Sequence, residues 1–412
     1  MSGSGIDRVV IIGTGQGGLQ LAASLRQEGF AGAITLIGDE PGLPYQRPPL
    51  SKTYMKEGNP DRLLLKPATF YESAGIRVLE STRAVAIDRA ARQVLTADGR
   101  RHDYDHLVLA TGARNSMPPV TGTDQEHVVG LRTLADAEAI RRRLPAIRRA
   151  VVIGGGFIGL EFASVARAAG VEVTVIEAQD RLMARAVSPP ISARFLDAHR
   201  AAGAGILLES LAATIGPPGA ESGVTLATGE HVGGDLVLIA TGVVPNTELA
   251  AEAGLAVENG IAVDESLRTA DPAISAIGDC ASVPGPDGSR IRLESVQAAV
   301  DHARHVARQL ATGETRPYAA VPWFWSDQGE LKLQIAGLAP RADRQIVLPE
   351  EGPVETVLGF RGDHLVSVET VNAPGPHMAA RKLFGLGPVS LAEVEGSGFD
   401  LRALAKGRAA SG

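Results

Sequence analysis

One stretch of sequence occurs twice in this chain, and it constrains the fold more than any other feature. Residues 8–40 run from an apolar, β-branched strand through the turn GTGQGG into a helical pattern and a second strand that ends at Asp39. Residues 149–179 repeat this order with the turn GGGFIG and a second strand that ends at Glu177. Strand, glycine turn, helix, strand and acid form a dinucleotide-binding βαβ unit. The sequence therefore predicts an α/β fold with two Rossmann-like domains.

Each part of this unit has a chemical reason. Glycines let the backbone turn tightly and approach a pyrophosphate, and the helix N-terminus presents free N–H groups and a positive dipole end to it. The acid accepts hydrogen bonds from ribose hydroxyls. A lone GxGxxG can be a structural turn, but two copies, each with its acid, make that the lesser alternative. We expect these residues to bind dinucleotides: Gly13, Gly15, Gly17, Gly18 and Asp39 in the first unit, and Gly154, Gly156, Phe157, Ile158, Gly159 and Glu177 in the second.

Two such domains in one chain indicate two dinucleotides. A flavin beside a nicotinamide is the economical pair, because hydride passes from one to the other while the protein orients them and excludes water. We assign FAD to the first domain and NAD to the second. A carboxylate at Glu177 repels a 2′-phosphate, and the nearest arginine after it is Arg181, so we expect NADH rather than NADPH.

Further phrases indicate the domain boundaries. An apolar strand runs into Ala-Thr-Gly at residues 110–112 and again at residues 240–242, as if closing each nucleotide-binding unit. From about residue 318 the pattern alternates as in antiparallel strands and is followed by a helical segment, which indicates a smaller α+β domain. We expect three domains: an FAD-binding domain of residues 1–113 and 244–317, an NAD-binding domain of residues 114–243, and a C-terminal domain of residues 318–412.

Composition excludes several other classes of protein. The single cysteine, Cys280, excludes an internal disulfide, a four-cysteine iron–sulfur cluster and a CxxC redox pair, and we expect it to be a small buried side chain. The histidines show no spacing typical of a metal site, so we expect none, and His302 and His305 are expected at the surface.

Charge and hydropathy point away from nucleic acid and membrane. The net charge of −7 argues against a general nucleic-acid-binding surface, and the five arginines of residues 141–149 indicate either a solvated helix face or a docking site. No apolar run approaches membrane-spanning length, and the N-terminus resembles a first strand rather than a signal peptide, so we expect a cytoplasmic protein.

The stretch PYQRPPLSK, residues 44–52, contains two adjacent prolines just before Lys52. The prolines preset the backbone, and we expect them to start a helix that presents the lysine. A lysine that is partly buried needs a counter-charge. Glu161 follows the second glycine turn by two residues, where we expect it on the first turn of the helix, as a complement to the helix dipole.

Eight motifs, in order along nearly the whole chain, resemble those of the FAD-dependent ferredoxin reductases of bacterial oxygenase systems, the putidaredoxin reductase and biphenyl-dioxygenase reductase group. They are GTGQGG (13–18), RPPLSK (47–52), DHLVLATG (105–112), VVIGGGFIGLE (151–161), IATGVVPN (239–246), AIGDC (276–280), ESVQ (294–297) and PWFWSDQ (322–328).

The resemblance implies FAD and NAD domains of the glutathione-reductase type, and electron transfer from NADH through FAD to a two-iron ferredoxin that serves a haem monooxygenase or a Rieske-type oxygenase. It implies that Lys52 and Glu161 form a charged, catalytic pair, and that Trp325 lies by the flavin edge which ferredoxin approaches. It adds further FAD residues and NAD residues: Lys52, Val85, Thr111, Gly112, Arg132, Asp279, Val296 and Trp325 for FAD, and Arg185 and Gly242 for NAD.

Two alternatives stay open at this stage. A reductase that serves rubredoxin has the same fold, and an NADH-responsive flavoprotein of the apoptosis-inducing-factor type also shares it. The sequence leaves the partner ferredoxin, the oxygenase, its substrate and the oligomeric state undetermined.

Overall fold

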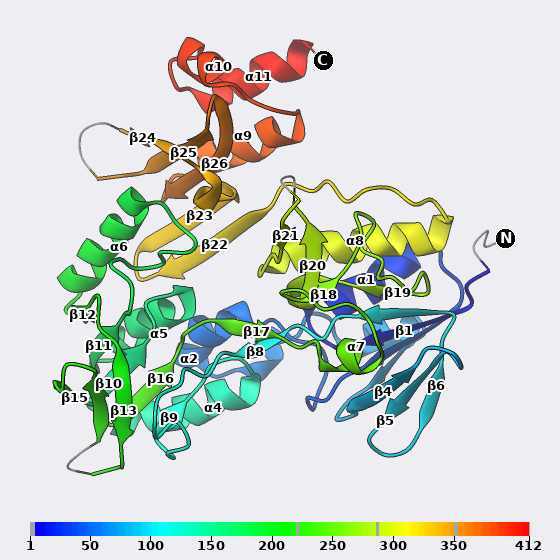
Figure 1. Cartoon of the computed structure of the whole chain (residues 1–412), viewed down its shortest axis with the longest axis horizontal. Helices are drawn as coiled ribbons and strands as arrows, with labels where there is room; N and C mark the ends of the chain where they lie inside the picture. Colours follow the sequence, from blue (N-terminus) through cyan, green and yellow to red (C-terminus); the bar gives the residue numbers. More distant parts are fainter. Residues whose placement is uncertain (1–4, 220–221, 286–287, 350–352, 412) are drawn as a thin grey trace. The chain divides into compact units, whose positions relative to one another are not determined.

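The computed structural model of the chain describes residues 5–219, 222–285, 288–349 and 353–411. Its contacts divide the chain into two compact units, which we describe separately (Figure 1). Unit 1 consists of residues 1–46, 60–114 and 244–320, and unit 2 consists of residues 47–59, 115–243 and 321–412.

Unit 1 is built on a parallel sheet with the strand order β19-β7-β1-β2-β3. The strand before the first glycine turn, β1, lies in the middle and pairs in parallel with β2 and β7. The main strands are β1 (Arg8–Ile12), β2 (Ala33–Ile37), β3 (Ile76–Leu79), β7 (His106–Leu109) and β19 (Ile274–Ala276). Two small sheets accompany them: β4 (Ala84–Asp88), β5 (Gln93–Thr96) and β6 (Arg101–Asp103), and β18 (Ile261–Ala262), β20 (Ala281–Pro284) and β21 (Arg290–Ile291).

Helices pack with the parallel sheet of unit 1 to form the first Rossmann-like fold. Helices α1 and α8 lie side by side (Figure 1). The helical segments are α1 (Gln16–Gln27), η2 (Pro60–Leu63), α3 (Ala68–Ser73), α7 (Glu248–Glu252), η4 (Gly278–Cys280) and α8 (Val296–Thr312).

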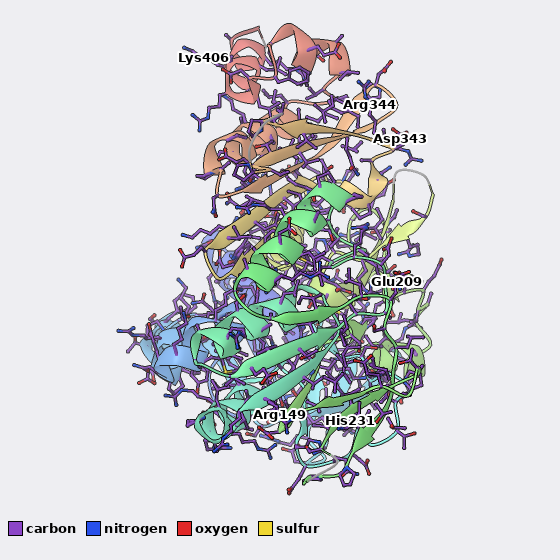
Figure 2. The ribbon with its side chains drawn as sticks, turned by 90° about the vertical axis from the view of Figure 1, so that its left-hand side faces the viewer. Arg149, Glu209, His231, Asp343, Arg344 and Lys406 are labelled. Atoms are coloured by element: carbon purple, nitrogen blue, oxygen red, sulfur yellow. The ribbon has the colours of Figure 1, made fainter. Side chains whose placement is uncertain are left out.

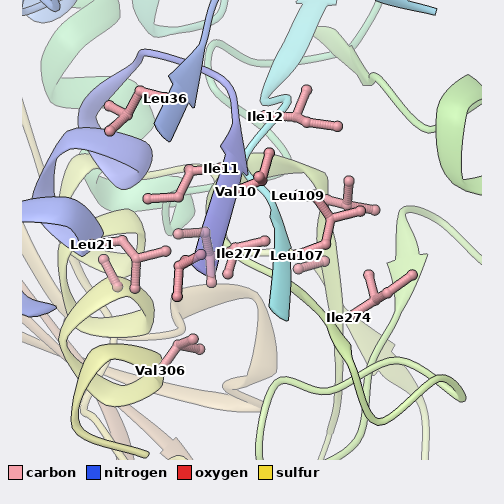
Figure 3. Close-up of a cluster of buried hydrophobic side chains, with 14 of the residues drawn as sticks. Val10, Ile11, Ile12, Leu21, Leu36, Leu107, Leu109, Ile274, Ile277 and Val306 are labelled. Atoms are coloured by element: carbon pink, nitrogen blue, oxygen red, sulfur yellow. The ribbon is translucent and has the colours of Figure 1, made fainter. Parts of the chain in front are cut away.

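The core of unit 1 explains the apolar runs of its sequence. Strands β1 and β7 are buried along nearly their whole length, as expected for parallel strands covered on both faces. Figure 3 shows Val10 and Leu107 from these strands with Leu21 of α1 and Val306 of α8 in one cluster. The predicted burial of Cys280 is confirmed, since its side chain is fully buried in this core.

Unit 2 contains the second parallel sheet, with the strand order β12-β11-β10-β16-β9. Its elements up to residue 243 are η1 (Pro48–Ser51), α2 (Thr53–Glu57), β9 (Val128–Val129), α4 (Leu134–Arg143), η3 (Leu144–Ala146), β10 (Arg149–Ile153), α5 (Phe157–Ala168), β11 (Glu172–Ile176), α6 (Pro189–Ala201), β12 (Gly205–Leu207), β13 (Ala212–Gly216), β14 (Gly223–Leu226), β15 (His231–Gly233) and β16 (Leu236–Ile239). Strands β8 (Ala113–Asn115) and β17 (Val243–Pro245) contain two of the points where the chain passes from one unit to the other.

The C-terminal part of unit 2 is an antiparallel sheet with the order β22-β23-β26-β25-β24, accompanied by helical segments. Its elements are β22 (Trp323–Gln328), β23 (Leu331–Gly337), η5 (Ala339–Arg341), β24 (Arg344–Leu348), β25 (Thr356–Arg361), β26 (His364–Val371), α9 (Pro374–Gly385), α10 (Leu391–Gly396) and α11 (Leu401–Ser411). The predicted fold class, two Rossmann-like parallel sheets and a smaller α+β part, is confirmed. The three domain boundaries stay a prediction, because the contacts define two units.

The run of five arginines does not form one helix face. Arg141, Arg142 and Arg143 end α4, whereas Arg149 begins β10, where it pairs with Asp235 and lies beside the ribbon that carries His231 (Figure 2). Within the described residues, no helix is both long enough and apolar enough to cross a membrane.

The expected surface position of His302 is wrong. Its side chain is fully buried, because α8 packs against α1 and η4, and its Nδ1 accepts a hydrogen bond of 3.1 Å from the backbone N–H of Gly278. His305 is half-buried and its ring lies edge-on to Tyr318. Burial lowers the pKa of His302 to about 4, and burial lowers the pKa of His106 on β7 to about 3.

These buried histidines predict acid lability. Both imidazoles stay neutral in the folded chain but take up protons near pH 6.5 in the unfolded chain, so their contribution is fully present above that pH and is lost as the pH falls toward 4. Going from about pH 7.5 to about pH 5 should cost about 2 kcal/mol of unfolding free energy per histidine. Urea midpoints across this range measure the loss. The variant His302→Gln should show a smaller pH dependence than the parent, and an identical dependence in both chains would contradict the assignment.

Candidate active site

In the first glycine turn, two glycines stand where the surrounding backbone leaves no room for a Cβ, and a third stands in open space. Gly13 has a φ of +116°, and a Cβ there would collide with the carbonyl of Ala110. A Cβ on Gly18 would collide with the carbonyl of Gly13. At Gly15, the N-cap of α1, a Cβ would meet nothing within 4 Å. The protein therefore leaves open space at Gly15, directly before the free N–H groups of a helix.

The second turn repeats this division in unit 2. Gly154 has a φ of +108° and a Cβ there would reach the carbonyl of Ala240 at 2.5 Å, while a Cβ on Gly159 would collide with the carbonyl of Gly154. A Cβ on Gly156, the N-cap of α5, would meet a single atom, 3.9 Å away. Open space at a helix N-terminus is what a pyrophosphate requires, so both turns fit a dinucleotide.

The two strand-end acids differ in how they are held. Glu177 accepts hydrogen bonds from the backbone N–H of Gly155 at 2.7 Å and from that of Gln179 at 2.8 Å, so its carboxylate is fixed against the glycine turn. Asp39 follows β2 by two residues and is exposed. The carboxylate at the second turn is thus oriented by the protein itself, in a place suited to a ribose.

The segment after Glu177 folds back toward the second turn. The backbone N–H of Met183 donates to the carbonyl of Gly155 at 2.9 Å. Arg185 is exposed, and its guanidinium lies 3.0 Å from where a Cβ of Gly242 would stand. Three predicted NAD residues, Glu177, Arg185 and Gly242, are therefore in the same unit as the glycine turn. Phe157 packs its ring 4.5 Å from that of Phe324, and Ile158 is exposed.

The remaining predicted FAD residues of unit 1 lie at ends of its elements. The Thr111 hydroxyl donates to the carbonyl of Asn246 at 2.6 Å, and Gly112 has a φ of +64°. Asp279 lies in η4, whose Gly278 N–H is held by His302. Val296 is the first residue of α8. Val85 stands at an irregularity of β4 and is 38% exposed.

Lys52, Arg132 and Trp325 belong to unit 2. Arg132 immediately precedes the cap of α4, and its carbonyl accepts a hydrogen bond of 2.7 Å from Arg47. Trp325 is half-buried on β22, with its ring 5.5 Å from that of Trp323. The contacts of these three residues with FAD stay predictions.

The predicted partner of Lys52 is present. Its ammonium lies 2.9 Å from Oε1 of Glu161, with side-chain exposures of 18% and 3%. The two prolines start η1, as expected, and this short helix delivers both Ser51 and Lys52 to the same carboxylate. The Ser51 hydroxyl donates to Oε2 at 2.6 Å. The ammonium also donates to the carbonyl of Pro48 at 3.3 Å.

The expected place of Glu161 on the first helical turn is wrong. Helix α5 begins at Phe157, so Glu161 is one turn further in, beyond the unpaired N–H groups that a first-turn acid would complement. Its carboxylate is nevertheless satisfied, since the Ser326 hydroxyl of β22 donates to Oε1 at 2.7 Å. A buried carboxylate persists only with such partners. Sequence reasoning missed Ser51 and Ser326. The alternation of Trp325 and Ser326 in PWFWSDQ, which turns them to opposite faces of a strand, was the available signal.

Comparisons with known proteins cover nearly the whole chain. Residues 7–303 match the family model described as pyridine nucleotide-disulphide oxidoreductase, and residues 323–405 match the model described as reductase C-terminal. The chain is similar to rhodocoxin reductase of Rhodococcus erythropolis, with 48% identity over 400 residues, which is 96% of this chain and 93% of that protein.

Two solved structures are similar along the same length. The ferredoxin reductase for the CYP199A2 system from Rhodopseudomonas palustris matches with a TM-score of 0.92 and 45% identity, over 97% of this chain and 100% of that chain. The covalent putidaredoxin reductase–putidaredoxin complex matches with a TM-score of 0.91 and 37% identity, over 98% of this chain and 99% of that chain.

The open glycine of the second turn allows a direct test of its ligand role. Gly156→Ala should raise the Kd for NADH while changing the unfolding free energy by no more than about 1 kcal/mol, because the new methyl occupies space that the protein leaves open. Gly159→Ala should instead destabilise the fold by about 1–3 kcal/mol, because its methyl meets backbone. Titration of NADH and urea unfolding measure the two effects. Equal effects of both substitutions on stability would contradict the division.

Proposed function

The chain belongs to the pyridine nucleotide-disulphide oxidoreductases, and from this premise we propose that it passes electrons from NADH through FAD to a two-iron ferredoxin. The observation that carries the proposal is the near full-length similarity to ferredoxin reductases, which includes the C-terminal domain. One of these neighbours is covalently joined to putidaredoxin in its structure. The ferredoxin would in turn serve a haem monooxygenase or a Rieske-type oxygenase.

The cysteine content supports an external acceptor. The family name includes disulphide reductases, whose chemistry needs a pair of cysteines, but this chain has the single residue Cys280. Its thiol is fully buried, it donates to the carbonyls of Leu109 and Ile277, and burial raises its pKa. A buried thiol of this kind is unreactive. The electrons therefore need an acceptor outside the chain.

The cofactors are FAD and NAD(H), and the residues present fit both. When bound, FAD accepts a hydride from NADH and releases electrons singly. Gly15 and the N-terminus of α1 would hold the FAD pyrophosphate, with Asp39 at the ribose. Gly156 and the N-terminus of α5 would do the same for NAD, with Glu177 at the ribose.

Two features of unit 2 support the expected preference for NADH over NADPH. Glu177 is held with its carboxylate against the glycine turn, where a 2′-phosphate would meet its negative charge. The nearest arginine in sequence, Arg181, donates to the carbonyls of Ala184 at 2.6 Å and Val187 at 2.9 Å, so its guanidinium is committed to the fold. Arg185 remains as a group for the adenosine side of NAD.

Lys52 would act as a fixed cation at the place where the nicotinamide reacts, with Glu161 as its counter-charge. Prolines of η1 hold the backbone that delivers it, and Ser51 holds the opposite oxygen of Glu161. The cytoplasmic location predicted from the sequence stays part of this proposal.

The choice of acceptor is tested by steady-state turnover with a panel of electron acceptors. With NADH as donor, we expect fast reduction of a two-iron ferredoxin, slower reduction of rubredoxin, and a preference for NADH over NADPH. Ferricyanide serves as a control that reports flavin turnover without protein recognition. Fast turnover with rubredoxin and none with two-iron ferredoxins would overturn the choice of acceptor.

A response to NADH without turnover would contradict the reductase function itself. Reduction of the flavin followed by a long-lived charge-transfer complex, with no transfer to any protein acceptor, would instead favour a sensor of the apoptosis-inducing-factor type.

A further inference from the structure

Strand β22 carries two buried polar side chains toward α5 and α6. Ser326 and Gln328 are two residues apart and therefore lie on one face of the strand, opposite to Trp325. Ser326 is fully buried and Gln328 is 3% exposed. In a strand that packs against apolar helices, buried polar groups are costly unless each one has a partner.

Both side chains have such partners, and together these form a chain of hydrogen bonds. The Ser326 hydroxyl donates to Oε1 of Glu161 at 2.7 Å, the same oxygen that the Lys52 ammonium approaches at 2.9 Å. The Gln328 amide Nε2 lies 3.2 Å from the Ser326 hydroxyl, to which it donates. Glu161 is thus tied at one oxygen to the C-terminal sheet and at the other to Ser51 of η1.

This series of hydrogen bonds continues from Gln328 to the second glycine turn. Nε2 of Gln328 also lies 3.5 Å from the Met183 sulfur, and the Gln328 carbonyl oxygen lies 2.9 Å from Nε2 of His199 on α6. Met183 is buried and has a φ of +51°, a conformation that costs a non-glycine residue about 1 kcal/mol or more and persists only where surrounding contacts hold it. Its backbone N–H in turn donates to the carbonyl of Gly155.

The charge on Glu161 explains why the position of Ser326 matters. A carboxylate can rotate about its last torsion, and its direction decides where the paired ammonium sits. Ser51 donates to one oxygen and Ser326 to the other, so these two hydroxyls fix the direction of the carboxylate independently of Lys52. Hydrogen bonds to a charged group are stronger than neutral ones, so the loss of either donor should measurably change the orientation of the Glu161 carboxylate.

We propose that Ser326 is a positioning residue for the reaction with NADH, because its hydroxyl orients Glu161 and thereby Lys52. Gln328 links this arrangement to Met183, whose backbone is hydrogen-bonded to Gly155 of the second glycine turn. The C-terminal sheet thus takes part in the reductive half of the reaction as well as in the transfer to the acceptor. This inference rests on the proposed function, in which Lys52 acts where the nicotinamide reacts.

The experiment uses the full chain with its flavin and three variants. Ser326→Ala removes the donor. Ser326→Cys keeps the shape of the side chain in a slightly larger form with a weak donor, and it carries the test if the alanine variant does not fold. Ser367→Ala is the matched control, because Ser367 of β26 is also fully buried in the C-terminal sheet and its hydroxyl has no hydrogen-bond partner among the described residues.

Two readouts are measured for each variant. The first is the rate constant of flavin reduction at saturating NADH, with the Kd for NADH determined separately. The second is independent of turnover: a brief pulse of acetic anhydride, followed by peptide mass spectrometry, gives the acetylation rate of Lys52 relative to Lys406. Lys406 is an exposed lysine of α11 (Figure 2) and serves as the internal reference.

We expect Ser326→Ala to lower the rate constant of reduction about tenfold and to raise the relative acetylation of Lys52 about tenfold, the effect of losing one hydrogen bond to a charged group. The Kd for NADH should change less than twofold. Ser326→Cys should lie between the parent and the alanine variant, and Ser367→Ala should match the parent in both readouts.

The proposal would be overturned if Ser326→Ala matched the Ser367→Ala control in both the rate constant of reduction and the acetylation of Lys52. If only Ser326→Cys folds, the same comparison is made with that variant. An increase in the Kd without a change in the rate constant would also overturn it, because that result indicates a general disturbance of NADH binding. If NADH does not reduce the flavin of the parent chain, the proposed function fails, and the acetylation of Lys52 alone decides whether Ser326 positions it.

Discussion

The arrangement of Lys52, Ser51 and Ser326 in unit 2 depends on their contacts with the buried carboxylate of Glu161. This carboxylate is only 3% exposed and is surrounded by three donors, the Lys52 ammonium and the hydroxyls of Ser51 and Ser326. The donors come from two stretches of the chain, η1 with its neighbour Lys52 and strand β22, and Glu161 lies on a third, α5, so the charge can be accommodated only when all three are folded together. Removing one partner of such a buried pair typically costs about 3–5 kcal/mol, because it leaves an uncompensated charge.

The duplicated glycine turns show how one sequence unit can serve both structure and ligand. In each turn, the first and last glycines are required by the backbone that they touch, namely the carbonyls of Ala110 and Gly13 in unit 1. The middle glycines, Gly15 and Gly156, touch almost nothing and leave room at a helix N-terminus. The packing of the protein therefore accounts for the first and last glycines of each GxGxxG pattern, and the open space at the middle glycine fits a bound dinucleotide.

The sequence predicted those features that are local and failed for those that depend on distant packing. Strand, turn, helix and acid are consecutive, so the parallel sheets and the positions of Glu177 and Gly156 beside the second turn could be expected. The pairing of Lys52 with Glu161 was expected only through a family resemblance. Ser326 lies 165 residues from Glu161, and no periodicity indicates which buried serine will face it. His302 was misplaced for the same reason, because its burial follows from the packing of α8 against α1 and η4.

Glu161 holds the Lys52 ammonium, and we propose that this cation acts on the reaction with NADH. This role of Lys52 is tested most directly by stopped-flow reduction of the flavin in Lys52→Met, with the FAD content measured on the same sample. We expect the rate constant of reduction to fall at least about tenfold while FAD is retained, since methionine keeps most of the length of the side chain but removes its charge. An unchanged rate constant, with FAD retained, would contradict the claim and leave Lys52 as a structural partner of Glu161.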